Sequence, residues 1–380
     1  MGSESERGKS TPSVPALVRW LDGASVADII GIPLEILDPF GARFDNLEPA
    51  VHYRAANRDL PEAPVDELSV MTWNIKFGGG RIDFWYDGHG DRVIMKRREV
   101  LKHLEGLGAK IRRTDPDVLL LQEVDVDSRR AAHIDQMQWL LDNTKLNFGA
   151  YASQWRSSFV PTRGLGRVDM GIAILSKYPI RDAQRLALPK MRTLDRITRY
   201  FYLKRAVLTA CIELPGVEPV HAVNVHTEAF SVDGTKRRHI DLFKGELDRI
   251  DAAGGRFVAG GDLNTVPPGS ERVGGFEDVA DRREAMFDVD DMYAGEEDWL
   301  VPLYENYQPA VDLEDYKRDH RPYYTFSATR DVFWCRKLDY LFTNGMFEEG
   351  SAITHQDVDS GGMETMELSD HAPVSASLRL

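Results

Sequence analysis

Residues 257–264 read FVAGGDLN, and this stretch decides what kind of fold the sequence is expected to form. Its first three residues have the apolar, strand-forming character of a buried strand, and two glycines follow them. Glycine has no Cβ atom, so another backbone or a ligand can approach it closely. Because alternate residues of an extended chain point to the same side, Asp262 and Asn264 present two oxygen-bearing side chains together. The stretch therefore predicts a buried strand that ends in a polar site.

Short apolar runs of the same kind lie on both sides of this stretch and predict further strands. Together, the predicted strands span residues 68–73, 118–121, 171–175, 206–212, 220–225, 257–259, 338–342 and 373–378. Between them, apolar residues recur at the spacing of an amphipathic helix over residues 93–107, 134–141 and 240–250. No repeat with a period of about 20 to 50 residues is visible, which disfavours a solenoid or a propeller. Strands that alternate with helices in this way indicate a layered α+β protein.

Polar side chains stand beside three other predicted strands. Asn74 follows the first strand, Glu123 follows the second, and Asp370 with His371 comes just before the last. A sheet presents such side chains rigidly into a cleft, and Asn74 and Glu123 together are suited to hold a hard cation. A glutamate after a strand or a single histidine is more often structural. Four such sets in one chain, however, favour one assembled active site.

Six motifs resemble, in order, the signatures of the endonuclease/exonuclease/phosphatase superfamily. They are TWN at 72–74, QE at 122–123, NVHTE at 224–228, GGDLN at 260–264, LDYLF at 338–342 and SDH at 369–371. The resemblance covers roughly residues 66–380. It extends to deoxyribonuclease I, to sphingomyelinases and inositol phosphatases, and to bacterial members of the type that remodels glycosylphosphatidylinositol anchors. It implies a deoxyribonuclease I-like α+β fold, a four-layer sandwich of two mixed β-sheets flanked by helices, with the active site at one edge.

The resemblance also implies a role for each residue that matches a family motif. The implied metal ligands are Asn74, Glu123 and Asp370. The implied catalytic residues are His226, Asp262, Asn264, Asp339 and His371. Within that set, Asp339 and His371 match a carboxylate and imidazole dyad. The implied phosphate-binding residues are Arg205, Asn264 and His226.

The chemistry of phosphate esters supports these roles. Hydrolysis of an anionic ester needs charge neutralisation, an activated water and help for the leaving oxygen. The implied metal ligands are oxygen donors, which suit Mg²⁺, with Mn²⁺ as an alternative, better than a set of histidines and cysteines would. Asp262 is suited to orient and deprotonate the water, while either His371 or His226 is suited to act as general acid. We therefore expect a metal-dependent phosphodiesterase or phosphomonoesterase, with the number of metal ions left open.

The charge of the chain bears on its substrate. The formal net charge is −14, whereas nucleic-acid binders neutralise phosphates with a basic face. Residues 276–325 are acidic and then aromatic and are long enough to cap a cleft, which disfavours a long polyanion. Residues 190–205 form a basic stretch suited to bind additional phosphates, or else a solvated or packed face. We expect a small phosphorylated molecule or a phospholipid headgroup as substrate.

Two alternatives to this substrate prediction stay open. One is a DNA endonuclease or exonuclease of the same fold. The other is a catalytically inactive module that binds phosphate. The first is tested by nicking of DNA and the second by turnover of a generic phosphodiester in the presence of metal.

The N-terminal part of the chain differs in character from the rest. Residues 1–66 contain scattered prolines without sustained periodicity and are predicted to be an extension, with a short helix considered at 14–21. Residues 67–380 are predicted to form the catalytic domain. The chain lacks a secretory signal and an apolar run of about 18 residues, so we expect a cytoplasmic monomer without a transmembrane segment. The only two cysteines, Cys211 and Cys335, indicate neither a disulfide framework nor a zinc site.

Overall fold

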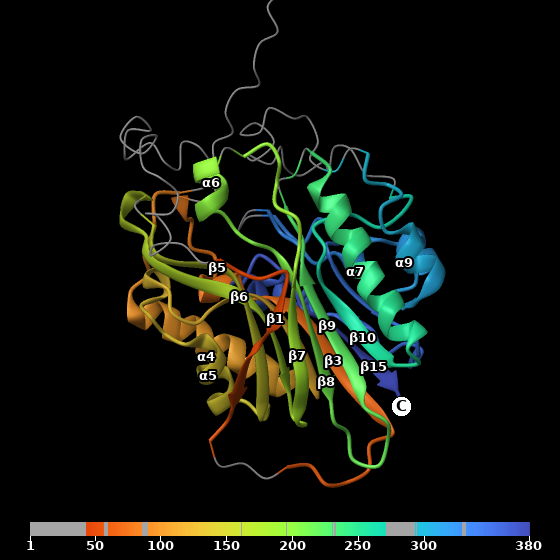
Figure 1. Cartoon of the computed structure of the whole chain (residues 1–380). Coiled ribbons are helices and arrows are strands. Elements are labelled where there is room, and N and C mark those ends of the chain that lie inside the picture. The colour runs from red at the N-terminus through yellow and green to blue at the C-terminus, as the bar shows by residue number, and fades with distance from the viewer. Residues whose placement is uncertain are drawn as a thin grey trace, which may run out of the picture.

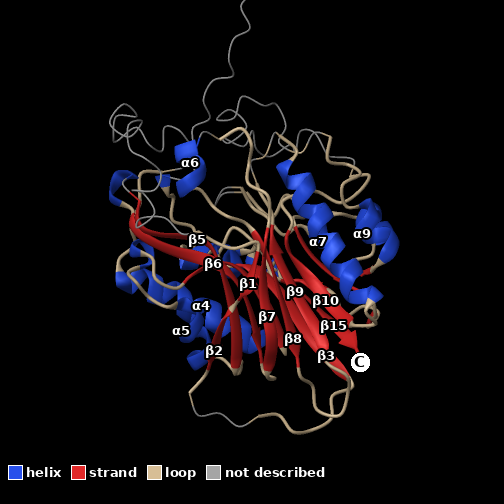
Figure 2. Ribbon diagram, in the orientation of Figure 1, coloured by secondary structure: helices blue, strands red, loops and turns tan. Residues whose placement is uncertain are grey.

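The structure is a computed structural model in which two β-sheets pack face to face, with helices on their outer sides (Figures 1 and 2). It describes residues 43–56, 60–85, 90–160, 162–194, 196–229, 231, 233–270, 293, 295–328 and 332–380. The predicted four-layer fold is confirmed. None of the helices in these described segments has the length and apolar character needed to span a membrane.

Both sheets are mixed. The described strands of the first sheet are, in spatial order, β1 (Leu47–Pro49), β7 (Ile180–Ala187), β8 (Ala206–Ile212), β9 (Val220–His226), β10 (Arg256–Asp262), β12 (Asp339–Thr343) and β11 (Gln308–Pro309). Those of the second are β13 (Met346–Phe347), β15 (Val374–Arg379), β3 (Glu67–Asn74), β4 (Val118–Asp125), β6 (Gly166–Ser176), β5 (Phe148–Val160) and β2 (Val51–Arg54), with β14 (Ile353–Thr354) paired to β15. Strands β9 and β10 run parallel, as do β3 and β4, and the other neighbours are antiparallel.

Side-chain alternation along the strands produces the layers. In β3, Leu68 and Val70 point into the core between the two sheets, whereas Met71 and Trp73 point to the helices on the other side. Each of these side chains is fully buried, so the strand is covered on both faces. A strand that is buried on both faces reads as a continuous apolar run, which is how the sequence predicts it.

Helices α4 (Arg97–Thr114) and α5 (Gln136–Asn143) cover the outer face of the second sheet, and α7 (Thr235–Ala252) and α9 (Val301–Asn306) cover that of the first (Figure 1). The shorter helices are α6 (Arg196–Phe201), α10 (Leu313–Arg318) and α11 (Met363–Met366). Single 3-10 turns occur at Lys76–Gly78, Arg129–Ala131, Thr162–Gly164, Arg321–Tyr323 and Val358–Ser360. The long helices form because each has one apolar stripe that the neighbouring sheet buries.

The eight predicted strands and three predicted helices are all present. The strand predicted over 206–212 has the same ends as β8, and the other elements have shifted ends. The helix predicted over 93–107 begins only at Arg97, where the backbone N–H of Lys96 donates to Glu99 Oε2 at 2.6 Å and caps it. Strands β5 and β7 were missing from the prediction. Strand β5 is continuously buried over residues 149–155 although these include Ser153 and Gln154, so its sequence shows neither an apolar run nor a regular alternation.

Strands β1 and β2 lie within residues 1–66, the segment predicted to be an extension. They are separated only by Ala50, yet β1 joins the first sheet and β2 joins the second. The buried guanidinium of Arg185 connects the sheets nearby, because its Nε donates to the carbonyl oxygen of Ser153 in β5 at 2.9 Å. The helix considered at 14–21 lies outside the described residues.

Candidate active site

Three neighbouring strands place His226, Asp262 and Asp339 in one row. Asp262, the last residue of β10, is the register partner of His226 in β9 and of Asp339 in β12. The two glycines before it are required by this close pairing. A Cβ atom on Gly261 would lie 1.9 Å from the carbonyl oxygen of Val225, and the residue has a φ of +134°. The sequence GGD therefore sets a carboxylate between an imidazole and a second carboxylate.

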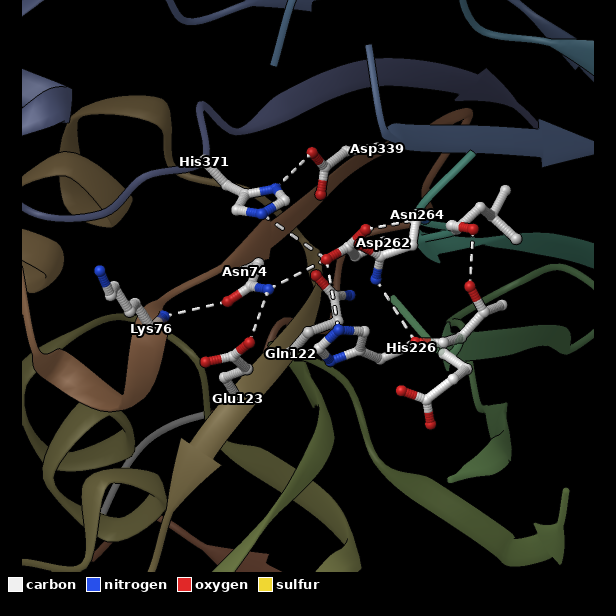
Figure 3. A network of polar contacts seen from close by, with 12 residues as sticks. Asn74, Lys76, Gln122, Glu123, His226, Asp262, Asn264, Asp339 and His371 are labelled. Atoms are coloured by element: carbon white, nitrogen blue, oxygen red, sulfur yellow. Dashed lines mark hydrogen bonds and ion pairs between the residues drawn. The ribbon is translucent and has the colours of Figure 1, made fainter. Parts of the chain in front are cut away.

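The carboxylate of Asp262 is the centre of the cluster (Figure 3). Its Oδ2 lies 3.3 Å from His226 Nε2, 3.6 Å from His371 Nε2 and 3.1 Å from Asn74 Nδ2. Burial raises the pKa of Asp262 to about 6, against the opposing effect of His371. A buried carboxylate with this pKa is suited to accept a proton near neutral pH.

His371 and Asp339 form the predicted dyad. His371 Nδ1 lies 2.8 Å from Asp339 Oδ2, and both side chains are buried. Burial alone would lower the pKa of His371, but Asp339 and Asp262 raise it to about 10, so the imidazole is charged at neutral pH. The ring is fixed through its own backbone, since the His371 carbonyl oxygen accepts from Trp73 Nε1 at 2.8 Å and its N–H donates to Ser369 Oγ at 3.1 Å.

His226 stands on the other side of Asp262 in the opposite charge state. Burial, with added repulsion from Arg205 and His371, lowers its pKa well below the usual value, so the ring is neutral. Its Nδ1 is buried and has no hydrogen-bond partner among the described residues. The two imidazoles that flank Asp262 thus differ in charge, and only that of His371 has a positive charge to offer an anion.

The three implied metal ligands lie at the end of the second sheet. Asn74 Nδ2 contacts Glu123 Oε1 at 3.3 Å as well as Asp262, so the amide connects the two carboxylates. Glu123 occupies a break in the pairing of β4 with β6 and has a φ of +55°, which is typical of a β-bulge that redirects a side chain. Asp370 Oδ2 lies 3.4 Å from Lys76 Nζ, and its side chain is partly exposed.

The donor set fits a hard cation. Glu123 and Asp370 offer partly exposed carboxylate oxygens. Asn74 lies beside Glu123 with its amide nitrogen facing that carboxylate, and its amide oxygen accepts the Lys76 N–H. A second group, Asp262, Asp339 and His371, has ligand atoms within 4.8 Å of one another and is fully buried. We favour the first set as the candidate metal site, because both nitrogens of His371 already face carboxylates.

Asn264 and Arg205 lie beside the cluster. The N–H of Asn264 donates to Asp262 Oδ1 at 3.0 Å, and its Nδ2 contacts the Thr227 carbonyl oxygen at 3.4 Å. Arg205 is buried, with Nη1 3.5 Å from Gln154 Oε1 and Nε 4.0 Å from a carboxylate oxygen of Glu228. Contacts therefore join seven of the residues selected from the sequence, namely Asn74, Glu123, His226, Asp262, Asn264, Asp339 and His371. Asp370 adjoins them as the chain neighbour of His371 and as the partner of Lys76.

Part of the basic stretch at 190–205 is engaged within the protein. Lys204 Nζ donates to the carbonyl oxygens of Tyr200 and Tyr202, and Arg199 Nη2 donates to two further carbonyl oxygens. Lys190 and Arg192 are exposed, and the side chain of Arg196 lies outside the described residues. The expected cap at 276–325 is described only in part, since residues 271–292 and 294 also lie outside.

Gln122 and Asn224 belong to two of the sequence motifs, but the sequence analysis assigned no role to either residue. Gln122 Nε2 donates to Asn224 Oδ1 at 2.8 Å, and Asn224 Nδ2 donates to the carbonyl oxygens of Leu121 and Ala173 in the opposite sheet. This buried network fixes β9 against β4 and β6 just below the cluster. Lys76, beside Asp370, was also missed. The signal available for all three was a polar residue within or directly after an apolar strand.

Comparisons with known proteins agree with this fold. A family model described as "Endonuclease/Exonuclease/phosphatase family" matches residues 71–371. A solved endonuclease/exonuclease/phosphatase from Beutenbergia cavernae DSM 12333 is 19% identical, with a TM-score of 0.53 over 83% of this chain and 72% of that one. ANGEL2, a 2′,3′-cyclic phosphatase, is 17% identical, with a TM-score of 0.50 over 88% of this chain and 98% of its own. These two similarities show a common fold. A search of curated proteins found no match.

Proposed function

This chain belongs to the endonuclease/exonuclease/phosphatase family, and from that premise we propose that it is a metal-dependent hydrolase of phosphate esters. The observation that carries the proposal is the position of Asp262 Oδ2, within 3.6 Å of a neutral imidazole, a charged imidazole and the amide that holds Glu123. A general base, a cationic group and a candidate cation site thus meet at one point. Hydrolysis of an anionic ester needs all three.

In the proposed reaction, Asp262 orients a water molecule and accepts its proton as the water oxygen bonds to phosphorus. The bond from phosphorus to the leaving oxygen breaks, and that oxygen takes a proton from an imidazole or from solvent. His371, held by Asp339, contributes a positive charge for the phosphoryl oxygens, and Asn264 donates to the same group through its amide. His226 is the neutral partner on the opposite side of Asp262.

Asn74, Glu123 and Asp370 are the residues proposed to hold the cation, with Mg²⁺ preferred and Mn²⁺ as the alternative. When bound, such an ion neutralises charge on the phosphoryl and leaving oxygens. Lys76 adds an ammonium next to Asp370, and its backbone N–H donates to Asn74 Oδ1 at 3.0 Å. This residue therefore aligns the amide and adds positive charge at the same place.

We propose a small phosphorylated molecule or a phospholipid headgroup as the substrate. The formal charge of −14 opposes a long polyanion. In the basic stretch, Arg199, Lys204 and Arg205 interact within the protein, so these cations do not contribute to an open basic surface. A small anion needs only the few donors around Asp262.

The test is a turnover panel with the full chain in Mg²⁺. It contains phosphomonoesters, inositol phosphates, nucleotides including cyclic ones, phospholipid vesicles, and plasmid DNA at physiological salt. We expect turnover of at least one small ester or headgroup, and its loss in Asp262→Asn, which has the same shape but cannot accept the proton. Nicking of plasmid DNA without turnover of any other class would replace this substrate with DNA. Absence of any turnover, with phosphate still bound, would favour the binding module.

A further inference from the structure

Lys236 lies in the first turn of α7 and is fully buried. Its Nζ lies 2.6 Å from Glu296 Oε1 and 2.7 Å from the carbonyl oxygen of Asn264. The rings of Tyr293 and Trp299 lie 5.1 and 5.8 Å from the same nitrogen. Burial of an ammonium is costly, and an apolar side chain of similar volume would fill the position without that cost. The presence of a lysine therefore indicates that its hydrogen bonds are needed.

The acceptor of one of those bonds is a strained part of the active site. Asn264 has a φ of +48°, in the left-handed region, which asparagine enters more readily than other residues with a Cβ atom but still at a cost in free energy. Such a conformation persists only where the surroundings fix it. The N–H of Asn264 is bound by Asp262 Oδ1, and its carbonyl oxygen is bound by Lys236. Lys236 thus holds one side of the peptide bond that follows the proposed phosphate-binding residue.

The neighbouring carbonyl oxygens are also bound, each by a different element. Thr227 Oγ1 donates to the carbonyl oxygen of Leu263 at 2.6 Å, and the Tyr340 hydroxyl donates to that of Thr265 at 2.7 Å. Of these three donors, Lys236 is the one with a cationic side chain. It is also the one that contacts Tyr293, Glu296 and Trp299. The conformation of the loop after β10 therefore depends on contacts from its own sheet and, through Lys236, on a contact from helix α7 outside the sheet.

We propose that Lys236 is a positioning residue that acts through Asn264, and that Glu296 connects residues 295–299 to the active site through Lys236. The inference rests on the proposed function, because it assigns Asn264 to the phosphoryl group. It adds that the loop is competent only while the buried pair is intact. Loss of the Lys236 hydrogen bond lets Asn264 leave the left-handed conformation, so that its side-chain amide no longer points at the phosphoryl group.

The experiment is a double-mutant cycle of Lys236→Met with Asn264→Ala, in which kcat and KM are measured on the best ester of the panel. Lys244→Met is the matched control, because Lys244 lies on the same helix, pairs with Asp248 at 2.8 Å and faces the ring of Tyr307. We expect Lys236→Met to lower kcat at least tenfold with little change in KM. The control should leave kcat unchanged, and Lys236→Met should cost little more once Asn264 is already alanine.

If Lys236→Met alone fails to fold, Lys236→Met combined with Glu296→Gln removes both buried charges and takes its place in the cycle. Near-normal kcat in the folded variant, or a loss that multiplies fully with that of Asn264→Ala, would overturn the positioning role. If Asn264→Ala is itself fully active, the proposed function of that residue is wrong. In that case the NMR amide signals of residues 264 and 265 decide the inference. They should shift in Lys236→Met and not in Lys244→Met, and unshifted signals overturn it.

Discussion

Replacement of His371 by alanine should reduce both stability and activity, and a second change should restore only the stability. The side chain stands between two buried carboxylates, with Asp339 Oδ2 at 2.8 Å and Asp262 Oδ2 at 3.6 Å. Asp339 Oδ1 has no hydrogen-bond partner among the described residues. Removal of the imidazolium therefore leaves two buried acidic groups without their counter-charge, which costs about 3–5 kcal/mol.

The expected shift in melting temperature follows from the size of the chain. Unfolding entropy scales with length and amounts to about 0.8 kcal/mol/K for 380 residues. His371→Ala should therefore lower Tm by roughly 4–6 °C. Asp339→Asn removes one of the two buried acidic groups, so the double variant His371→Ala with Asp339→Asn should recover a substantial part of the lost Tm.

The assay pairs calorimetry at neutral pH with kcat for wild type, both single variants and the double variant. We expect the double variant to be more stable than His371→Ala but no more active, because the cationic group is missing in both. A double variant that is less stable than His371→Ala would refute the explanation that buried acidic groups without a counter-charge cause the loss of stability. Losses of kcat that multiply fully would show that the two residues do not act as a unit.

Excess chelator should abolish turnover, and Mg²⁺ or Mn²⁺ should restore it. Glu123→Gln should weaken metal binding in calorimetric titration and lower kcat. The Tm of this variant without metal should stay within about 1 °C of the wild-type value. Full activity in chelator would rule out the metal site. Gly261→Ala should lower kcat by roughly 10² or more and reduce Tm, because the new Cβ atom would displace the strand that carries His226. A crystal structure of that variant with β9 unmoved and kcat unchanged would contradict the steric argument. His226→Ala should lower kcat by roughly 10², and an unimpaired variant would assign this residue a structural role only.

Strand ends made the candidate site predictable from the sequence. Asp262 and His226 are the last residues of β10 and β9, and Asp339 is the first residue of β12. In each case the residue type changes from apolar to polar within one position, and such a change is visible in a single sequence. The motif resemblance then supplied the pairing of Asp339 with His371. The distances that support the assignment depend on register, which the sequence alone does not define.

Other features were hidden because their residue types contradict their environment. Lys236 occurs among charged residues at the start of an amphipathic helix, where a lysine is normally solvated, yet it is fully buried. Gln154 and Ser153 gave β5 the appearance of a loop, although tertiary contacts bury both side chains. The side-chain partners of Lys236 and Gln154 come from distant segments, so no local pattern reveals the burial of these two residues.

The crossing of the chain from one sheet to the other at Ala50 has a consequence for shortened versions of the protein. A version that starts at residue 67, where the resemblance to the family begins, would lack β1 and β2 together. Strands β7 and β5 would then each present a row of unpaired backbone groups on the same side of the molecule, and exposed strand edges of this kind recruit other chains. Residues 47–54 therefore cover one edge of each sheet, and shortened versions of the protein should retain them to avoid aggregation.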